Sequence, residues 1–307
     1  MKTILVTAIG GDIAQSIAII LRQEKPGVRL VGVDMHDRHG GMSFVDVYHQ
    51  VPPASDPRYP EVIFDLVQRE NIDVIFPVSE NELAVWSRGV FSGEVDFIMP
   101  NTKIIDIGLD KLATAKFLEE IGHHVPWTIP VTDGMPKRLP CIIKSRTGSG
   151  GKAMFVVRTP EDVKFFARRY PNSVYQELLE PNDREVTCAV YRDRSGNTHV
   201  LQMLRKLVGG LTGWATVITD SAVERECVRV AEGTDLKGSI NIQLMLTPQG
   251  PRIFEINARF SSTILMRHQL GFQDVIWSLD ELEGDSVRTP RISSGQVVVR
   301  TYGARVI

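Results

Sequence analysis

The first hundred residues alternate between short apolar runs and segments in which apolar residues recur at helical spacing. The runs occupy residues 3–8, 29–34, 74–78 and 95–99, and the helical segments occupy residues 13–22, 61–70 and 80–87. Strands that alternate with helices form a parallel sheet covered on both faces, so the sequence predicts a doubly wound α/β domain. Ligands of such sheets bind where the strands end, which makes Glu80 and Asn81 candidate substrate contacts.

The loop after the first strand carries Gly10 and Gly11, and Asp34 ends the second strand. This arrangement suggests a dinucleotide site. The full G-x-G-x-x-G pattern is absent, however, because Ala14 and Gln15 stand where a later glycine would fall. A dehydrogenase is therefore disfavoured. The glycines also fit a tight strand-to-helix turn, or a helix N-terminus that holds a substrate carboxylate.

Length and composition exclude other classes of function. A chain of 307 residues can hold two or three domains or subdomains. A net charge of −2 argues against a nucleic-acid binder, and no apolar run is long enough to span a membrane. The chain begins on a strand pattern, and its cysteines, Cys141, Cys188 and Cys227, form no C-x-x-C motif. We therefore expect a cytoplasmic protein with reduced thiols, without nucleic acid or membrane as partners.

The stretch at 240–262, INIQLMLTPQGPRIFEINARFSS, carries the most chemistry. Two β-rich runs flank the turn cluster at 247–250, so the sequence predicts a β-hairpin. Side chains of a strand alternate between its two faces. On the second strand we expect Phe254, Ile256 and Ala258 to point into a core.

The other face of this hairpin is polar. It presents Glu255, Asn257 and Arg259, and a turn centred on residue 249 places Gln243 opposite Glu255. Three oxygen donors on one face suit Mg²⁺, which completes its shell with water and phosphate oxygens. An arginine beside them suits a bidentate phosphate contact. A solvated polar strand face is the alternative.

The segment 140–157, PCIIKSRTGSGGKAMFVV, predicts two strands, at 141–145 and 153–157, around a glycine-rich loop. Backbone N–H groups of such a loop can cover phosphates. The segment is not a P-loop, because Arg146 replaces the required glycine, Ala153 follows Lys152 in place of Ser or Thr, and a strand follows the loop instead of a helix. Lys144 lies in an apolar strand, where burial favours an anionic partner, either a phosphate or a carboxylate in a structural salt bridge.

Two further segments contain candidates. Residues 110–121 predict a helix capped by Asp110, with Lys111 in the first turn, where a cation opposes the helix dipole. Lys111 is therefore either a site residue or a surface lysine. The strand-like segments at 174–179 and 185–191 could offer backbone groups to an adenine and a carboxylate to a ribose.

Taken in order, four stretches resemble the ATP-grasp superfamily, and in particular its carbamoyl-phosphate-synthase-like branch. They are DKLATAKFLEEIG, PCIIKSRTGSGGKAMFVV, VYQELLEPNDREVTCAV and the hairpin stretch, and together they cover about residues 110–271. The resemblance implies a Rossmann-like (pre-ATP-grasp) domain followed by a two-part α+β domain with ATP between its parts. The implied bounds are 1–109 for the first domain, 110–125 for a connecting helix, 126–178 for a lid subdomain and 179–307 for the catalytic subdomain.

The same resemblance implies roles for individual residues. The nucleotide contacts would be Lys111 and Lys144 on the phosphates, Gly148, Ser149, Gly150 and Gly151 in the covering loop, Glu177 and Leu179 at the adenine, and Glu185 at the ribose. The metal ligands would be Gln243, Glu255 and Asn257, and the catalytic residues Arg259 and Lys144. Further substrate candidates are Arg205, with Lys206 beside it, and Arg267. One departure is the insert at 180–184, which lengthens the hinge next to the adenine.

The activity that the resemblance implies is ligation. ATP would convert a carboxylate to an acyl phosphate, and an amine would displace the phosphate, with ATP and Mg²⁺ as cofactors and Mn²⁺ left open. A single ATP module argues against carbamoyl phosphate as the product and for two small-molecule substrates. A carboxylate kinase, a carboxylase or a non-catalytic nucleotide-binding protein remain alternatives, and a homodimer is left open.

Overall fold

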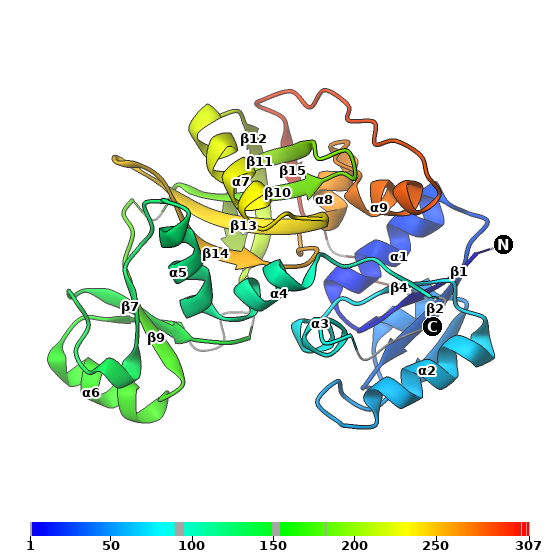
Figure 1. The fold of residues 1–307 in the computed structure, drawn as a ribbon, viewed down its shortest axis with the longest axis horizontal. Coiled ribbons are helices and arrows are strands. Elements are labelled where there is room, and N and C mark those ends of the chain that lie inside the picture. The colour runs from blue at the N-terminus through cyan, green and yellow to red at the C-terminus, as the bar shows by residue number, and fades with distance from the viewer. Residues whose placement is uncertain are drawn as a thin grey trace.

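The computed structural model describes residues 2–89, 95–148, 154–181, 183–301, 303, 304 and 306. These residues form three sheets, one in each of three successive parts of the chain (Figure 1). The first sheet is parallel, with the strand order β3-β2-β1-β4-β5 and helices on both faces, which confirms the predicted doubly wound domain. Its elements are β1 (Thr3–Val6), α1 (Asp12–Glu24), β2 (Arg29–Asp34), η1 (Gly40–Phe44), β3 (Val47–Gln50), α2 (Tyr59–Glu70), β4 (Val74–Phe76), α3 (Glu80–Trp86) and β5 (Asp96–Phe97).

The second sheet is antiparallel, with the order β6-β9-β7-β8 and its own apolar core against α6. We call this part the lid sheet. Two helices, α4 (Thr102–Leu109) and α5 (Lys111–Glu120), lead into it. Its elements are β6 (Thr128–Pro130), η2 (Val131–Asp133), β7 (Cys141–Ser145), β8 (Phe155–Val157), α6 (Pro160–Arg169) and β9 (Ser173–Glu177).

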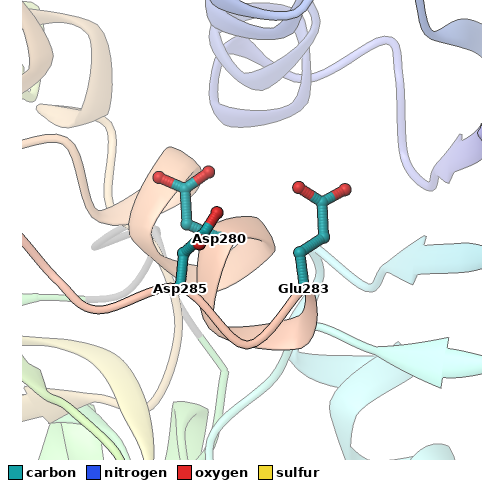
Figure 2. Close-up of side chains that lie close together, drawn as sticks. All are labelled: Asp280, Glu283 and Asp285. Carbon is teal, nitrogen blue, oxygen red and sulfur yellow. The ribbon is translucent and has the colours of Figure 1, made fainter.

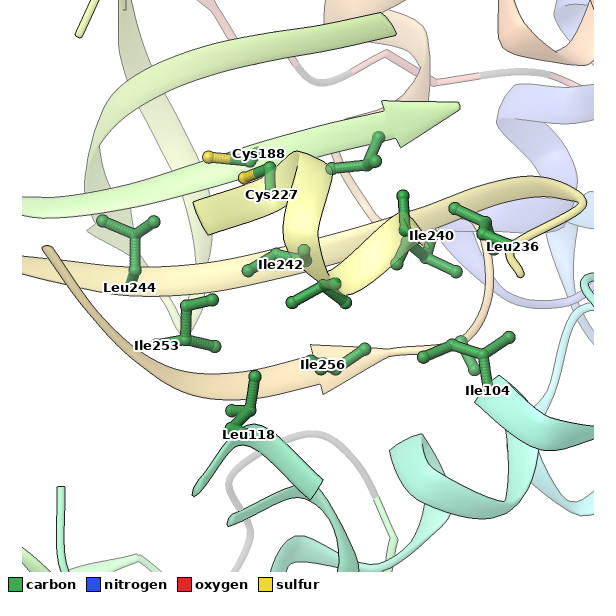
Figure 3. Packing of buried hydrophobic residues seen from close by; sticks show 14 of the residues in the cluster. Ile104, Leu118, Cys188, Cys227, Leu236, Ile240, Ile242, Leu244, Ile253 and Ile256 are labelled. Carbon is green, nitrogen blue, oxygen red and sulfur yellow. The ribbon is translucent and has the colours of Figure 1, made fainter. Parts of the chain in front are cut away.

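The third sheet has six strands in the order β14-β13-β10-β11-β12-β15. Its core lies between the sheet and helices α4, α5 and α7, and includes the buried thiols of Cys188 and Cys227 (Figure 3). The elements are β10 (Glu185–Arg192), β11 (Thr198–Val208), β12 (Leu211–Ile218), α7 (Ser221–Gly233), β13 (Gly238–Thr247), β14 (Gly250–Asn257), α8 (Ile264–Gln269), α9 (Asp274–Leu282) and β15 (Val297–Val299).

Helices α8 and α9 return to the first part of the chain and lie beside α1 (Figure 1). Ile264 and Val275 belong to the same buried cluster as Ile4 and Ile17, and the ring of Phe260 lies 6.1 Å from that of Phe76. The N-terminal core is therefore completed by residues from the other end of the chain. None of the described helices is long and apolar enough to cross a membrane.

The predicted hairpin is formed by β13 and β14, and Gln243 pairs with Glu255 as predicted. The register shifts at the next pair: Leu244 pairs with Ile253 instead of Phe254, so that Phe254 is an extra residue on β14. The expectation that Phe254 points into the core is therefore wrong. A bulge moves its side chain out of the alternation, and Ile253 takes the buried position instead, while Ile256 and Ala258 are buried as predicted.

Candidate functional site

The polar face of the β13–β14 hairpin gathers oxygen donors. Gln243 and Glu255 are opposed and half-buried, and Asn257 is buried on the next pair of the same face. Among the described residues, no hydrogen bond or ion pair satisfies the Glu255 carboxylate. A half-buried, unpaired carboxylate beside two amide oxygens fits a hard divalent cation.

Sequence reasoning missed one member of this face. Asn241 pairs with Asn257 and is fully buried, and its Oδ1 accepts a hydrogen bond of 3.0 Å from the hydroxyl of Thr187. Its Nδ2 has no partner within the part of the chain that the structure describes. The signal was its position two residues before Gln243, which on a strand means the same face.

Arg259 joins this hairpin to the N-terminal sheet. Its Nη2 donates to Glu80 Oε1 at 3.2 Å and to Asn257 Oδ1 at 3.4 Å, and its Nη1 donates to the Phe260 carbonyl at 3.0 Å. Glu80 is the first residue of α3 and follows the N-cap Ser79. It therefore lies just beyond the end of β4, on the side of the N-terminal sheet that faces the hairpin residue Arg259. Two candidates from distant segments, Arg259 and Glu80, thus meet, while the neighbouring Asn81 is exposed.

Lys144 reaches the hairpin from the lid sheet. Only 7 % of its surface is exposed, and its Nζ donates to the Phe254 carbonyl at 3.2 Å and lies 5.7 Å from the centre of the Phe254 ring. Burial lowers the pKa of this amine to about 8. The positive charge of Lys111 also lowers this pKa, whereas the negative charge of the nearby Glu255 carboxylate raises it. No carboxylate of the described residues lies within 4.0 Å, so the structural salt bridge considered from the sequence does not form.

Lys111 approaches from the first turn of α5. Its Nζ donates to the Gly148 carbonyl at 2.9 Å, and Gly148 has a φ of +85°, which favours glycine. Asp110 caps the helix as predicted and is held by Arg146, whose Nη2 lies 2.6 Å from Asp110 Oδ2. The predicted covering-loop residues Ser149, Gly150 and Gly151 lie outside the described residues.

The two carboxylates assigned to the nucleoside are each held by an arginine. Arg252 donates to Glu177 Oε1 at 2.9 Å and Oε2 at 2.7 Å, and this contact lowers the pKa of Glu177. It connects the lid sheet to β14. Glu185 forms an ion pair with Arg205 on the neighbouring strand β11. Leu179 follows β9 and is 7 % exposed.

The remaining substrate candidates lie differently. The Arg267 side chain is fully buried, and its Nε donates to Asp274 Oδ1 at 3.1 Å, with further contacts to Ser261 and Ser239. This is the environment of a structural ion pair and not of a substrate contact. Lys206 is exposed near the C-terminal end of β11.

A separate group of carboxylates, Asp280, Glu283 and Asp285, lies at the end of α9 (Figure 2). Asp280 is bound by Lys25 at 2.8 Å, and Glu283 is bound by Lys2 at 3.0 Å. These ion pairs fasten α9 to the N-terminal domain. The group contains none of the predicted site residues.

Comparison with known families gives two matches. The description "ATP-grasp domain" matches residues 109–263, slightly more than half of the chain, and "PylC-like, N-terminal domain" matches residues 4–89.

Several curated proteins are similar. A formate-dependent phosphoribosylglycinamide formyltransferase of Thermococcus kodakarensis is 26% identical over 296 residues, which cover 86% of this chain and 67% of that protein. A 3-methyl-D-ornithine–L-lysine ligase of Methanosarcina acetivorans is 23% identical, with coverages of 85% and 68%. A carbamoyl phosphate synthase large chain of Thermoplasma volcanium is 22% identical over 66% of this chain, which spans only 22% of that protein.

Solved structures share the fold. The ADP complex of an N5-carboxyaminoimidazole ribonucleotide synthetase has a TM-score of 0.75 and 18% identity, with 97% of this chain and 81% of the other covered. The biotin carboxylase domain of Hydrogenobacter thermophilus 2-oxoglutarate carboxylase, solved with MgADP and bicarbonate, has a TM-score of 0.74 and 16% identity, with coverages of 96% and 73%. These likenesses confirm the predicted arrangement of the α/β and α+β parts.

Proposed function

The chain belongs to the ATP-grasp domain family, and on that premise we propose that it is an ATP- and Mg²⁺-dependent ligase. In this proposal it activates a small carboxylic acid as an acyl phosphate and joins it to an amine, with release of ADP and phosphate. The observation that carries the proposal is the unpaired Glu255 carboxylate, which lies beside Gln243 and Asn257 and close to Lys144. Such a group of charges suits a metal-bound polyphosphate.

Each charged residue has a distinct part in this proposal. Gln243, Glu255 and Asn257 would hold Mg²⁺, which when bound neutralises charge on the phosphates. Lys144 and Lys111 would leave the carbonyls of Phe254 and Gly148, which they now bond, and donate to phosphate oxygens instead.

Arg259 would hold the reacting phosphate beside Glu80, where the N-terminal domain delivers the substrate. Glu80 could also accept a hydrogen bond from the incoming amine. Positioning and charge neutralisation are the main tasks in such a transfer, because the phosphoryl group itself needs little covalent assistance from the protein.

The names of the relatives support a carbon–nitrogen ligase, since they include a lysine ligase and a carbamoyl phosphate synthase. A second candidate is a carboxylase, in which bicarbonate is the acid that becomes activated. It is supported by a structural neighbour solved with MgADP and bicarbonate. We further propose the cytoplasm as the location and a lid formed by residues 126–178 as the moving subdomain.

The reaction path can be tested with labelled substrate. Pairs of amino acids and small acids, and bicarbonate alone with amines, are screened for ADP release with ATP and Mg²⁺. For an active pair, ¹⁸O in the acid's carboxylate should appear in inorganic phosphate, because that oxygen leaves with the phosphate. Label in AMP, with pyrophosphate as co-product, would contradict the acyl-phosphate path. ADP with unlabelled phosphate would show plain ATP hydrolysis and remove the support for ligation.

A further inference from the structure

A cavity of about 580 Å³ lies between the N-terminal sheet and the six-stranded sheet, and no part of the proposed nucleotide site explains it. One wall comes from the segment that follows β5, and the other from the β10–β11 turn and the loop before β13. Gln243, Glu255, Lys111 and Lys144 do not line it. Among the described residues of the proposed site, Arg259 alone does. Its volume is in the range of small-molecule sites, which often occur at such interfaces.

The floor of this cavity is apolar. It is made by Leu83, Ile98, Met99, Leu236, Phe260 and Leu282. These side chains come from both domains, and most of them also belong to the two cores on either side. An apolar floor of this size suits the hydrocarbon body of a ligand.

The acidic residues around the cavity already have partners. Asp193 accepts from the Asn197 backbone at 2.8 Å and contacts His199 at 3.0 Å, and Asp235 accepts from Arg192 at 2.6 Å. Glu281 accepts from the hydroxyl of Tyr191 at 2.6 Å and from the Arg194 backbone at 2.7 Å. Each of these carboxylates therefore accepts at least one hydrogen bond within the protein.

The cations at the rim are not satisfied in this way. Arg194 and Lys237 line the cavity with exposed side chains, and neither forms an ion pair with any residue that the structure describes. Their backbones are fixed nearby, since Arg194 N bonds Glu281 and Lys237 follows the buried Leu236. Lys237 also interacts electrostatically with Asp235, but neither cation is engaged in a short ion pair with a described residue. Two such cations beside an apolar floor match an anion with an apolar body.

We propose that this cavity binds a small amphipathic anion, such as an aliphatic or aromatic acid, at a site separate from the nucleotide site. The apolar body lies on the floor and the acidic group contacts Arg194 and Lys237. Arg259 lines the cavity and also bonds Glu80 and Asn257. An occupant that contacts Arg259 would therefore affect the position of these two residues of the proposed ligase site. The site itself does not depend on the proposed ligase activity.

The test uses two fluorescent probes, 8-anilinonaphthalene-1-sulfonate and the uncharged N-phenyl-1-naphthylamine, titrated into the whole protein with and without MgADP. The double variant Arg194→Gln/Lys237→Gln should weaken the sulfonate about ten-fold or more, the usual scale for loss of a charge-assisted contact, and leave the neutral probe unchanged. The matched control is Lys164→Gln/Arg168→Gln, on exposed positions of α6.

Three outcomes would overturn the proposal: unchanged sulfonate affinity in the double variant, an equal loss in the control, or displacement of the sulfonate by MgADP. Circular dichroism verifies that each variant is folded. We expect all of them to fold, because the four substituted residues are exposed. Natural acids are then ranked by displacement of the sulfonate. Consumption of such an acid during ATP turnover identifies a substrate, whereas an altered rate without consumption identifies an effector.

Discussion

Replacing Lys144 by methionine separates a ligand-binding role from a structural one. The lysine is almost fully buried, and its pKa falls from 10.5 to about 8. At about 1.4 kcal/mol per pKa unit, the buried charge costs about 3 kcal/mol of folding stability at neutral pH. Lys144→Met removes this cost and loses the hydrogen bond to Phe254, which contributes about 1 kcal/mol. We therefore expect a gain of about 2 kcal/mol in the free energy of unfolding.

The pH dependence of this gain follows from the direction of the pKa change. Below pH 8 the lysine is charged in both the folded and the unfolded chain, so the full cost is present. Between pH 8 and 10.5 the folded protein releases its proton while the unfolded chain keeps it, and the cost disappears as pH rises. The advantage of Lys144→Met over the wild type should therefore be largest near pH 7 and shrink to less than half by about pH 9.5.

Two measurements on the ligand-free protein and one with nucleotide test this reasoning. The unfolding temperature at pH 7 should be roughly 3 °C higher in the variant than in the wild type, and this difference should become smaller at pH 9.5. Calorimetry should show ATP binding weakened roughly 10- to 100-fold, because one charged phosphate contact is lost. The control is Lys116→Met, at an exposed lysine of α5, which should change neither quantity. Unchanged ATP affinity together with a less stable apo protein would refute the reasoning.

Two further substitutions test the metal-side carboxylate and the buried ion pair. Glu255→Gln should abolish ADP release while the protein stays folded, because it removes one charge and little volume from a carboxylate that has no hydrogen-bond or ion-pair partner among the described residues. Wild-type turnover with the same Mg²⁺ dependence would contradict the assignment. Asp274→Asn should lower the unfolding temperature by roughly 5–8 °C, since it leaves the buried Arg267 charge unpaired at a cost of about 3–5 kcal/mol. The exposed Asp285→Asn is its control, and an equal effect of the two would show that Arg267 is not held by this pair.

The sequence predicted features that depend on local periodicity. The alternation before residue 100 gave the parallel sheet, and the spacing around the turn placed Gln243 opposite Glu255. Strand β3 was not predicted, because it is short and its residues are half-buried, so its apolar pattern is weak. The bulge at Phe254 also left no local signal, since the extra residue preserves the apolar character of the strand.

Features that depend on distant partners could not be predicted. Glu177 lies on a lid strand, and only the fold shows that Arg252, from the hairpin, occupies its carboxylate. Arg267 follows the hairpin in sequence, yet the return of α8 toward α9 buries it against Asp274. Whether a charged side chain is free or paired is decided by the chain that packs against it, which no single stretch reveals.

Phe260 connects two parts of the molecule. Three residues after Asn257, its ring is already inside the N-terminal core, and Arg259 between them is bonded to Glu80. The N-terminal domain and the β13–β14 hairpin are thereby connected by an apolar and a polar contact. The lid sheet has its own core, and two of its contacts with β14 are those of Lys144 with Phe254 and of Glu177 with Arg252. If the proposed lid moves during turnover, we expect the contact between Glu80 and Arg259 to persist, because both residues lie outside the lid sheet.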